Sequence, residues 1–203
     1  MTRESWKADV FDRLYARDPD PWRFETSAYE QAKYADTLAQ LGDRHFGHAL
    51  ELGCSIGVLS RKLAARCDRL LALDLAEAAL ERARLHCAGL DHVQFRRATL
   101  PQDWPAREPH GTFDLVLISE MLYFLAPDDI ARLAHRGAEA ALPECTVLLV
   151  NWTGPTDTPT TGDEAAGLFR DALQAEAPGF SADAPLHRNG YRLDRLHRPA
   201  PHS

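Results

Sequence analysis

A glutamate and two glycines stand close together in the segment ALELGCSIGVLSRKL, which runs from residue 49 to residue 63. Glu51 lies in an apolar stretch that predicts a buried strand, where a carboxylate is costly to bury unless a cation or a hydrogen-bond donor pairs with it. Gly53 and Gly57 allow the backbone to approach a ligand closely, because glycine has no Cβ. The helix predicted after this turn offers N–H groups that have no partner inside the helix. Together these features predict a loop that holds a cofactor.

A second acid follows at a distance that suits a nucleoside. The apolar run from residue 70 to residue 73 predicts another strand, which ends at Asp74, 21 residues after Gly53. Rossmann-like units place an acid on the two hydroxyls of a ribose at this spacing. The alternative is an ordinary strand, turn and helix with a buried glutamate and an aspartate at a strand end. Because the loop, the acid and the spacing agree, the cofactor interpretation is favoured.

Three cofactor classes compete for this loop. A phosphate-binding P-loop is excluded because no Gly-Lys-Ser/Thr string follows the turn. A dinucleotide site is disfavoured because the GxGxxG pattern is absent: Cys54, Ser55 and Ile56 separate the two glycines. The segment resembles the first motif of the class I S-adenosylmethionine-dependent methyltransferases, an acid followed by glycines at alternate positions.

This resemblance implies that the first acid and the glycine turn hold the methionine end of S-adenosylmethionine. It implies that the second acid and its neighbour hold the ribose. The residues concerned are Glu51, Gly53, Cys54, Ser55, Gly57, Asp74 and Leu75. Ser55 departs from the family pattern, which more often has a third glycine there. We therefore expect a slightly tighter loop in which the site is retained.

Aromatic and basic residues are concentrated before this loop. A helix is predicted over residues 6–15, and a second helix begins after Ser27, because Glu30 completes a capping box with it. The prolines at positions 19 and 21 predict a turn or an extended chain between the two helices. These side chains either pack the helices onto the sheet or form a lid over the cofactor, which is our hypothesis. The expected lid or substrate residues here are Trp22, Arg23, Tyr29 and Tyr34.

The string LYARDPDPWRFETSAYEQAKY in this region resembles the N-terminal signature of the nodulation protein S family. Members of that family N-methylate the deacetylated amino sugar of a chitooligosaccharide. The similarity extends through the glycine loop, the SEMLYFL string and the TGDEAAGLF string, so it covers most of the chain. Its cofactor motifs are general to class I enzymes. The family resemblance therefore indicates the chemistry better than the substrate.

The rest of the chain alternates between predicted strands and helices. Apolar runs predict strands over residues 92–98, 113–118 and 145–150. Thr161 and Glu164 form a second capping box, which predicts a helix after the fifth strand. An Asn-Gly turn predicts a closing hairpin of residues 184–188 with 191–198. In the helix predicted from residue 76 to residue 88, the inner positions are assigned to Leu80, Ala83 and Leu85.

The resemblance implies a single α/β domain with the Rossmann-like class I methyltransferase fold. This fold has a seven-stranded, mostly parallel sheet in the order 3-2-1-4-5-7-6, with helices on both faces. A chain of 203 residues fits one such domain. We expect an N-terminal helical lid over residues 1–44, a core over residues 45–198 and a disordered tail over residues 199–203.

Ligands of open α/β sheets bind outside the carboxyl ends of the strands. The residues that follow the third predicted strand are Thr99 and Leu100, where related enzymes commonly have an acid for the adenine amino group. We therefore expect adenine to be held at Thr99 and Leu100, with backbone groups or the later Asp103 as the acceptor.

The ends of the next two strands carry the candidate substrate contacts. Ser119 and Glu120 follow the fourth strand and should border the reactive sulfonium. Glu120 is the candidate catalytic residue, with helix capping or a salt bridge as its alternative role. Tyr123 and Trp152 are expected beside the substrate.

Composition limits the partners. The formal charge of −7, from 23 basic and 30 acidic residues, argues against a nucleic acid as the main partner. The four cysteines lack CxxC or zinc spacing, so they indicate reduced thiols in the cytoplasm. No segment has the pattern of a membrane span or signal peptide, and the nine histidines lack ligand spacing, so neither a membrane nor a metal is expected.

The sequence therefore predicts an S-adenosylmethionine-dependent methyltransferase that acts on an amine of a small molecule or amino sugar. An O-methyltransferase is the main alternative, because spacing and periodicity do not distinguish nitrogen from oxygen acceptors. An NAD-dependent oxidoreductase and a non-catalytic cofactor-binding protein are further alternatives. The oligomeric state is not predicted.

Overall fold

The computed structural model of the chain describes residues 3–105 and 112–199, which form two compact units. The N-terminal unit comprises Lys7–Thr99, and the C-terminal unit comprises Met1–Trp6 together with Leu100–Ser203. Of the tail predicted to be disordered, residues 200–203 lie outside the described residues.

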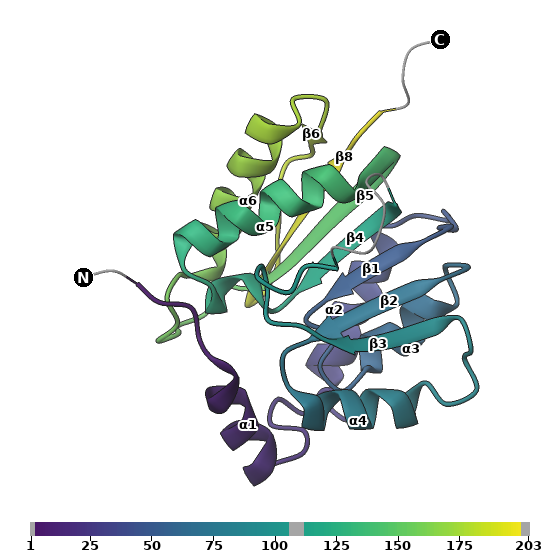
Figure 1. The fold of residues 1–203 in the computed structure, drawn as a ribbon, viewed down its shortest axis with the longest axis vertical. Helices are drawn as coiled ribbons and strands as arrows, with labels where there is room; N and C mark the ends of the chain where they lie inside the picture. The colour runs from purple at the N-terminus through teal and green to yellow at the C-terminus, as the bar shows by residue number, and fades with distance from the viewer. Residues whose placement is uncertain (1–2, 106–111, 200–203) are drawn as a thin grey trace. The chain divides into compact units, whose positions relative to one another are not determined.

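The N-terminal unit contains a parallel sheet in the order β3-β2-β1 (Figure 1). Its strands are β1 (Ala49–Leu52), β2 (Leu70–Asp74) and β3 (Val93–Arg97), and its helices are α1 (Ala8–Arg17), α2 (Ala28–Ala39), α3 (Val58–Ala64) and α4 (Glu77–His86). Every residue of β1 is buried, as is each residue of β2 before Asp74. Burial on both faces explains why these strands are continuous apolar runs.

Strand register places the chemistry of this unit at one edge. Leu52 pairs with Leu73, and Asp74 pairs with Arg97. Because the strands are parallel, their carboxyl ends meet at the same side of the sheet. The glycine loop after β1 and the acid that ends β2 are therefore neighbours.

The C-terminal unit contains a mixed sheet in the order β4-β5-β8-β6 (Figure 1). Its strands are β4 (Phe113–Ser119), β5 (Ala141–Trp152), β6 (Ser181–Ala182), β7 (Leu186–His187) and β8 (Tyr191–His197), and its helices are η1 (Leu122–Phe124), α5 (Pro127–Ala140) and α6 (Gly162–Glu176). Strands β4 and β5 are parallel, whereas β8 is antiparallel to β5. Helices α5 and α6 pack against each other, and α6 also contacts β5 and β8.

The strand orders of the two units correspond to the two halves of the predicted order. Strand β8 occupies the position that was predicted for the seventh strand. One sixth strand was predicted to pair with it, whereas two short strands, β6 and β7, do so. Both predicted N-caps are present: the Ser27 side chain accepts from the Glu30 N–H, and Thr161 accepts from that of Glu164. These caps satisfy N–H groups that a helix start leaves without partners.

One inner position in α4 was predicted wrongly. Leu80 and Ala83 are fully buried, but Leu85 is 77% exposed. Residue 85 lies five positions after Leu80, which turns its side chain about 140° around the helix axis. The apolar type of Leu85 therefore does not match its place on the helix.

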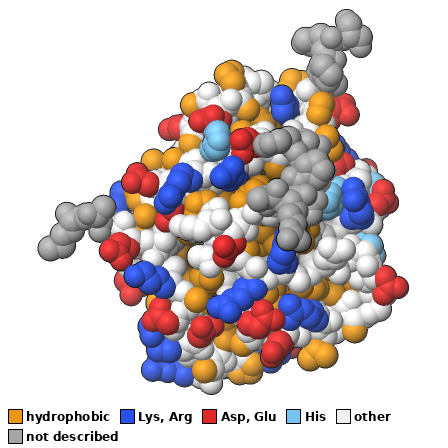
Figure 2. Space-filling view, viewed as in Figure 1, with side chains coloured by type: hydrophobic (Ala, Val, Ile, Leu, Met, Phe, Trp, Pro, Cys, Tyr) orange, Lys and Arg blue, Asp and Glu red, His pale blue; other side chains and the backbone are white. Residues whose placement is uncertain are grey.

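Acidic and basic side chains are interspersed over the face of the molecule seen in Figure 2. Within the two described ranges, no helix combines the length and the apolar character needed to cross a membrane.

Candidate functional site

The loop after β1 has an unusual backbone. Gly53 and Gly57 have φ angles of +80°, and Ser55 between them has φ +48°. L-residues other than glycine rarely adopt this left-handed conformation. The loop is attached to the end of β2, because the N–H groups of Gly53 and Cys54 both donate to the Leu73 carbonyl, at 2.9 and 3.1 Å. Its shape is therefore fixed by its own backbone and by the neighbouring strand.

Asp74 binds the loop through its side chain. Oδ2 accepts from the Ser55 N–H at 2.8 Å, and Oδ1 accepts from the Ala76 N–H at 3.0 Å. Burial raises the pKa of Asp74, while the backbone hydrogen bonds from Ala76, Ser55 and Leu75 act to lower it. A carboxylate has about four lone-pair directions, so these backbone bonds leave acceptor capacity for a ligand. The predicted acid thus lies beside the predicted loop.

Glu51 is the least satisfied group of this edge. Glu51 is only 1% exposed, and its Oε2 atom has no hydrogen-bond partner among the described residues. Burial and the nearby Asp74 raise the pKa of Glu51 to about 7, although the Ser60 hydroxyl lies close enough to lower it somewhat. Ser60 Oγ itself makes no hydrogen bond of normal geometry. A buried carboxyl oxygen of this kind is satisfied by a cation or donor from a bound group.

Cys54 and Gly57 complete the loop in different ways. Burial raises the pKa of the Cys54 thiol well above its usual value, so this side chain is neutral and packs as an apolar group. A Cβ at Gly57 would lie 2.8 Å from both Cα and Cβ of Ala83 in α4. Glycine at position 57 therefore permits both the left-handed turn and the close packing of the loop on α4.

A second cluster of predicted residues lies in the C-terminal unit. Glu120 follows β4 with φ +56°, and its Oε2 accepts from the Tyr123 hydroxyl at 2.7 Å and from the Trp152 N–H at 3.1 Å. Ser119 beside it is 7% exposed. Glu120 is therefore held in place by the residue that ends β5 and by a tyrosine of η1. This arrangement fixes the direction of a carboxylate at a strand end.

The predicted lid residues differ in their exposure. Trp22 and Tyr29 are 37% and 36% exposed, whereas Tyr34 is 5% exposed and belongs to the core. Trp22 stacks on Phe24, with ring centroids 5.6 Å apart. Arg23 has φ +59°, and its exposed guanidinium makes no hydrogen bond or ion pair with other described residues. Trp22, Arg23 and Tyr29 are thus exposed, and the Lys33 ammonium lies 5.3 Å from the centroid of the Tyr29 ring.

The structure brings together some of the predicted residues and leaves others apart. The glycine loop, Glu51, Asp74 and Leu75 form one group in the N-terminal unit, and Ser119, Glu120, Tyr123 and Trp152 form another in the C-terminal unit. Thr99 is exposed and Leu100 is half-buried after β3. Sequence reasoning missed Tyr15, whose hydroxyl lies 2.5 Å from Ser55 Oγ. The helix predicted over residues 6–15 includes Tyr15, but the sequence pattern gave no sign of its polar partner.

Residues 7–142 match the family described as Nodulation protein S. Nodulation protein S of Bradyrhizobium diazoefficiens is 37% identical over 117 residues, which are 57% of this chain and 54% of that protein. A ubiquinone biosynthesis O-methyltransferase of Pseudomonas aeruginosa is 38% identical over 90 residues, 43% of this chain and 38% of that protein. The chain therefore spans about half the length, or less, of the curated relatives it matches.

Solved structures show the same fold. The N-methyltransferase NodS from Bradyrhizobium japonicum WM9, crystallised with S-adenosyl-L-homocysteine, superposes with a TM-score of 0.75 at 20% identity. The superposition covers 95% of this chain and 98% of that chain. The predicted Rossmann-like class I methyltransferase fold is confirmed.

Replacing Gly57 by alanine should destabilise the protein by about 3 kcal/mol, because the new Cβ meets the Ala83 backbone and the residue must keep a positive φ. Gly89→Ala is the matched control: Gly89 has φ +84° but nothing within 4 Å of its Cβ position. The control should cost about 1 kcal/mol. Free energies of unfolding from urea titration measure both, and equal losses would show that the contact with α4 is unimportant.

Protonation of Glu51 should make stability depend on pH. The folded state binds this proton more tightly than the unfolded chain, because the pKa rises from 4.5 to about 7. The stabilisation is complete below the pKa of Glu51 in the unfolded chain. It is lost as the pH rises through the pKa of Glu51 in the folded protein. Relative to Glu51→Gln, the wild-type free energy of unfolding should fall by up to about 3 kcal/mol between about pH 5 and pH 8.

The control for this measurement is Glu81→Gln, a change of an exposed carboxylate in α4. Its stability should follow the wild-type curve over the whole pH range. Parallel curves for wild type and Glu51→Gln would show instead that Glu51 ionises in the folded protein as it does in the unfolded chain.

Proposed function

The chain belongs to the nodulation protein S family, and we propose that it transfers a methyl group from S-adenosylmethionine to an amine of a small molecule or amino sugar. The observation that carries the proposal is the unpartnered carboxyl oxygen of Glu51 beside the left-handed loop and Asp74. These groups fit a ligand that has both a cationic amino group and a ribose. S-adenosylmethionine has both.

The residues of the N-terminal unit divide the cofactor between them. Glu51 would accept from the amino group of the methionine moiety, which supplies the donor that Oε2 lacks. Asp74 would accept from the ribose hydroxyls while it keeps its bonds to the loop. Backbone N–H groups of the loop, together with Leu75 and Thr99, would surround the adenosine.

The cofactor, when bound, supplies a methyl group on a positively charged sulfur that a nucleophile can attack. The protein then has mainly to orient the acceptor and exclude water. An amine must lose its proton before it can attack. Glu120 would take this proton or attract the ammonium form, because Tyr123 and the Trp152 N–H hold its carboxylate in one direction.

Aromatic side chains would bind the cationic part of the substrate. Trp22 and Tyr29 are exposed, and Tyr123 is bonded to the candidate base. A cation over such a ring gains about 0.5 to 2 kcal/mol. The Arg23 guanidinium, which has no partner among the described residues, would bind a negatively charged group of the ligand.

Methyl transfer to oxygen is the second candidate, and the similarity to a ubiquinone biosynthesis O-methyltransferase favours it over the remaining alternatives. An oxidoreductase is disfavoured by the missing GxGxxG pattern. We further propose a cytoplasmic location and no nucleic-acid or membrane partner. The net charge of −7, the interspersed surface charges and the buried free cysteines support this view.

Removing the Asp74 carboxylate should weaken cofactor binding. Charge-assisted hydrogen bonds contribute about 1.5 to 3 kcal/mol, so Asp74→Ala should raise the dissociation constant for S-adenosylhomocysteine about 10- to 150-fold. Calorimetric titration measures this, with Asp68→Ala as the control because Asp68 is exposed just before β2. A folded Asp74→Ala protein with wild-type affinity would remove Asp74 from the cofactor site.

Replacing Glu120 by glutamine should affect turnover more than cofactor affinity. The amide keeps the shape of the side chain but takes up protons poorly, so turnover should fall about 100-fold or more. Methyl transfer to a panel of small amines and deacetylated chitooligosaccharides measures this, and titration with S-adenosylhomocysteine measures affinity. Wild-type turnover in Glu120→Gln would make this residue structural.

A further inference from the structure

Helix α1 reaches the glycine loop through one tyrosine. The Tyr15 hydroxyl lies 2.5 Å from Ser55 Oγ, although the two residues are 40 positions apart in the sequence. Tyr15 is only 7% exposed. The hydrogen bond is therefore made inside the N-terminal unit and is partly buried.

Ser55 is the residue through which this contact can influence the cofactor site. Its backbone N–H donates to Asp74 Oδ2 at 2.8 Å, while its side chain bonds to Tyr15. Its φ of +48° is strained for a residue that has a Cβ. Strain of this kind persists only when surrounding contacts hold the residue in place. The Tyr15 hydroxyl is such a contact.

Packing around Tyr15 supports the same segment. Tyr15 belongs to an apolar cluster with Ile56 of the loop and with Ala76 and Ala79 at the start of α4. Ala76 also donates its N–H to Asp74 Oδ1. The tyrosine therefore packs against residues on both sides of the Asp74 carboxylate.

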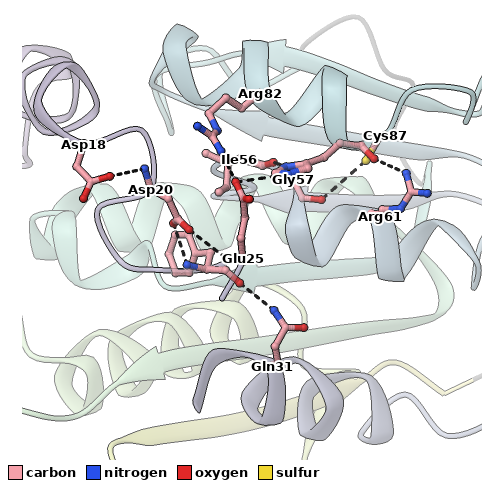
Figure 3. A network of polar contacts seen from close by, with 11 residues as sticks. Asp18, Asp20, Glu25, Gln31, Ile56, Gly57, Arg61, Arg82 and Cys87 are labelled. Atoms are coloured by element: carbon pink, nitrogen blue, oxygen red, sulfur yellow. Dashed lines mark hydrogen bonds and ion pairs between the residues drawn. The ribbon is translucent and has the colours of Figure 1, made fainter. Parts of the chain in front are cut away.

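The chain after α1 is fastened to α4, and the end of α4 in turn contacts the same loop (Figure 3). Asp20 closes the turn by accepting from the N–H groups of Phe24 and Glu25, at 2.8 and 3.0 Å. The Glu25 carboxylate pairs with Arg82 of α4. His86, at the end of α4, lies within 3.5 Å of the Glu25 carboxylate and contacts the Ile56 carbonyl with its other ring nitrogen at 2.6 Å. These contacts restrain the position from which Tyr15 reaches Ser55.

We propose that Tyr15 is a positioning residue of the cofactor site, which holds Ser55 in its left-handed conformation so that the loop N–H stays on Asp74. The proposal rests on the proposed function, because it assigns Tyr15 to the site where S-adenosylmethionine would bind. A glycine at position 55 would adopt the left-handed conformation without support. In this chain the hydrogen bond with Tyr15 holds Ser55 in that conformation instead. Burial, and the nearby Asp74, raise the pKa of Tyr15, so its hydroxyl stays protonated at neutral pH.

A double-mutant cycle tests this role with S-adenosylhomocysteine as the probe. Tyr15→Phe and Ser55→Ala should each weaken binding about 2- to 10-fold, and the double variant should be no weaker than the single ones, because both remove the same bond. In a Ser55→Gly background, Tyr15→Phe should change the affinity less than 2-fold, since glycine adopts this φ without support. Tyr191→Phe, a buried tyrosine of β8, is the control and should bind as wild type.

Wild-type affinity in Tyr15→Phe, or an equal loss in the wild-type and Ser55→Gly backgrounds, would overturn the positioning role while the proposed function stands. Failure of the wild-type protein to bind the probe would overturn the proposed function. Hydrogen exchange of residues 53–57 then tests the contact without ligand. Faster exchange in Tyr15→Phe than in Tyr191→Phe would support the proposal that the Tyr15 hydroxyl restrains the loop. Equal exchange in the two variants would overturn that proposal.

Discussion

The burial of Glu51 is the constraint on which the N-terminal unit depends. Its carboxyl group lies near the end of a strand that is buried on both faces, and one of its oxygens has no partner in the part of the chain that the structure describes. Burying the charged carboxylate costs free energy. This cost raises the pKa of Glu51, so the group remains protonated to a higher pH. A ligand that brings a cationic donor removes the cost. The edge of the sheet is therefore better suited to a bound cofactor than to the empty protein.

Asp74 links that constraint to the rest of the unit. It fixes the loop through the Ser55 N–H and the start of α4 through the Ala76 N–H. The loop in turn packs on α4 at Gly57 and is contacted by α1 at Ser55. The N-terminal helix is thus part of the support of the binding loop. This arrangement gives the aromatic N-terminal segment a structural role beside its expected role as a lid.

Much of the fold followed from the sequence because local rules specify it. Buried parallel strands, the caps at Ser27 and Thr161 and the spacing from Gly53 to Asp74 each have a direct physical signature. The exposure of Leu85 and the bond between Tyr15 and Ser55 lack one. Leu85 is apolar on a face that packing leaves to solvent, and the Tyr15 contact joins residues 40 positions apart. Such features depend on how helices pack, which periodicity does not specify.

The most direct test of the account is calorimetric titration of the protein with S-adenosylhomocysteine near pH 7, in two buffers of different ionisation heat, with NAD as the control. The account predicts micromolar binding of S-adenosylhomocysteine and none of NAD. It also predicts release of a proton on binding, because pairing with the amino group lowers the pKa of Glu51 from about 7. Binding of NAD, no binding of S-adenosylhomocysteine, or binding without proton release would contradict the assignment of Glu51 as the partner of the cofactor.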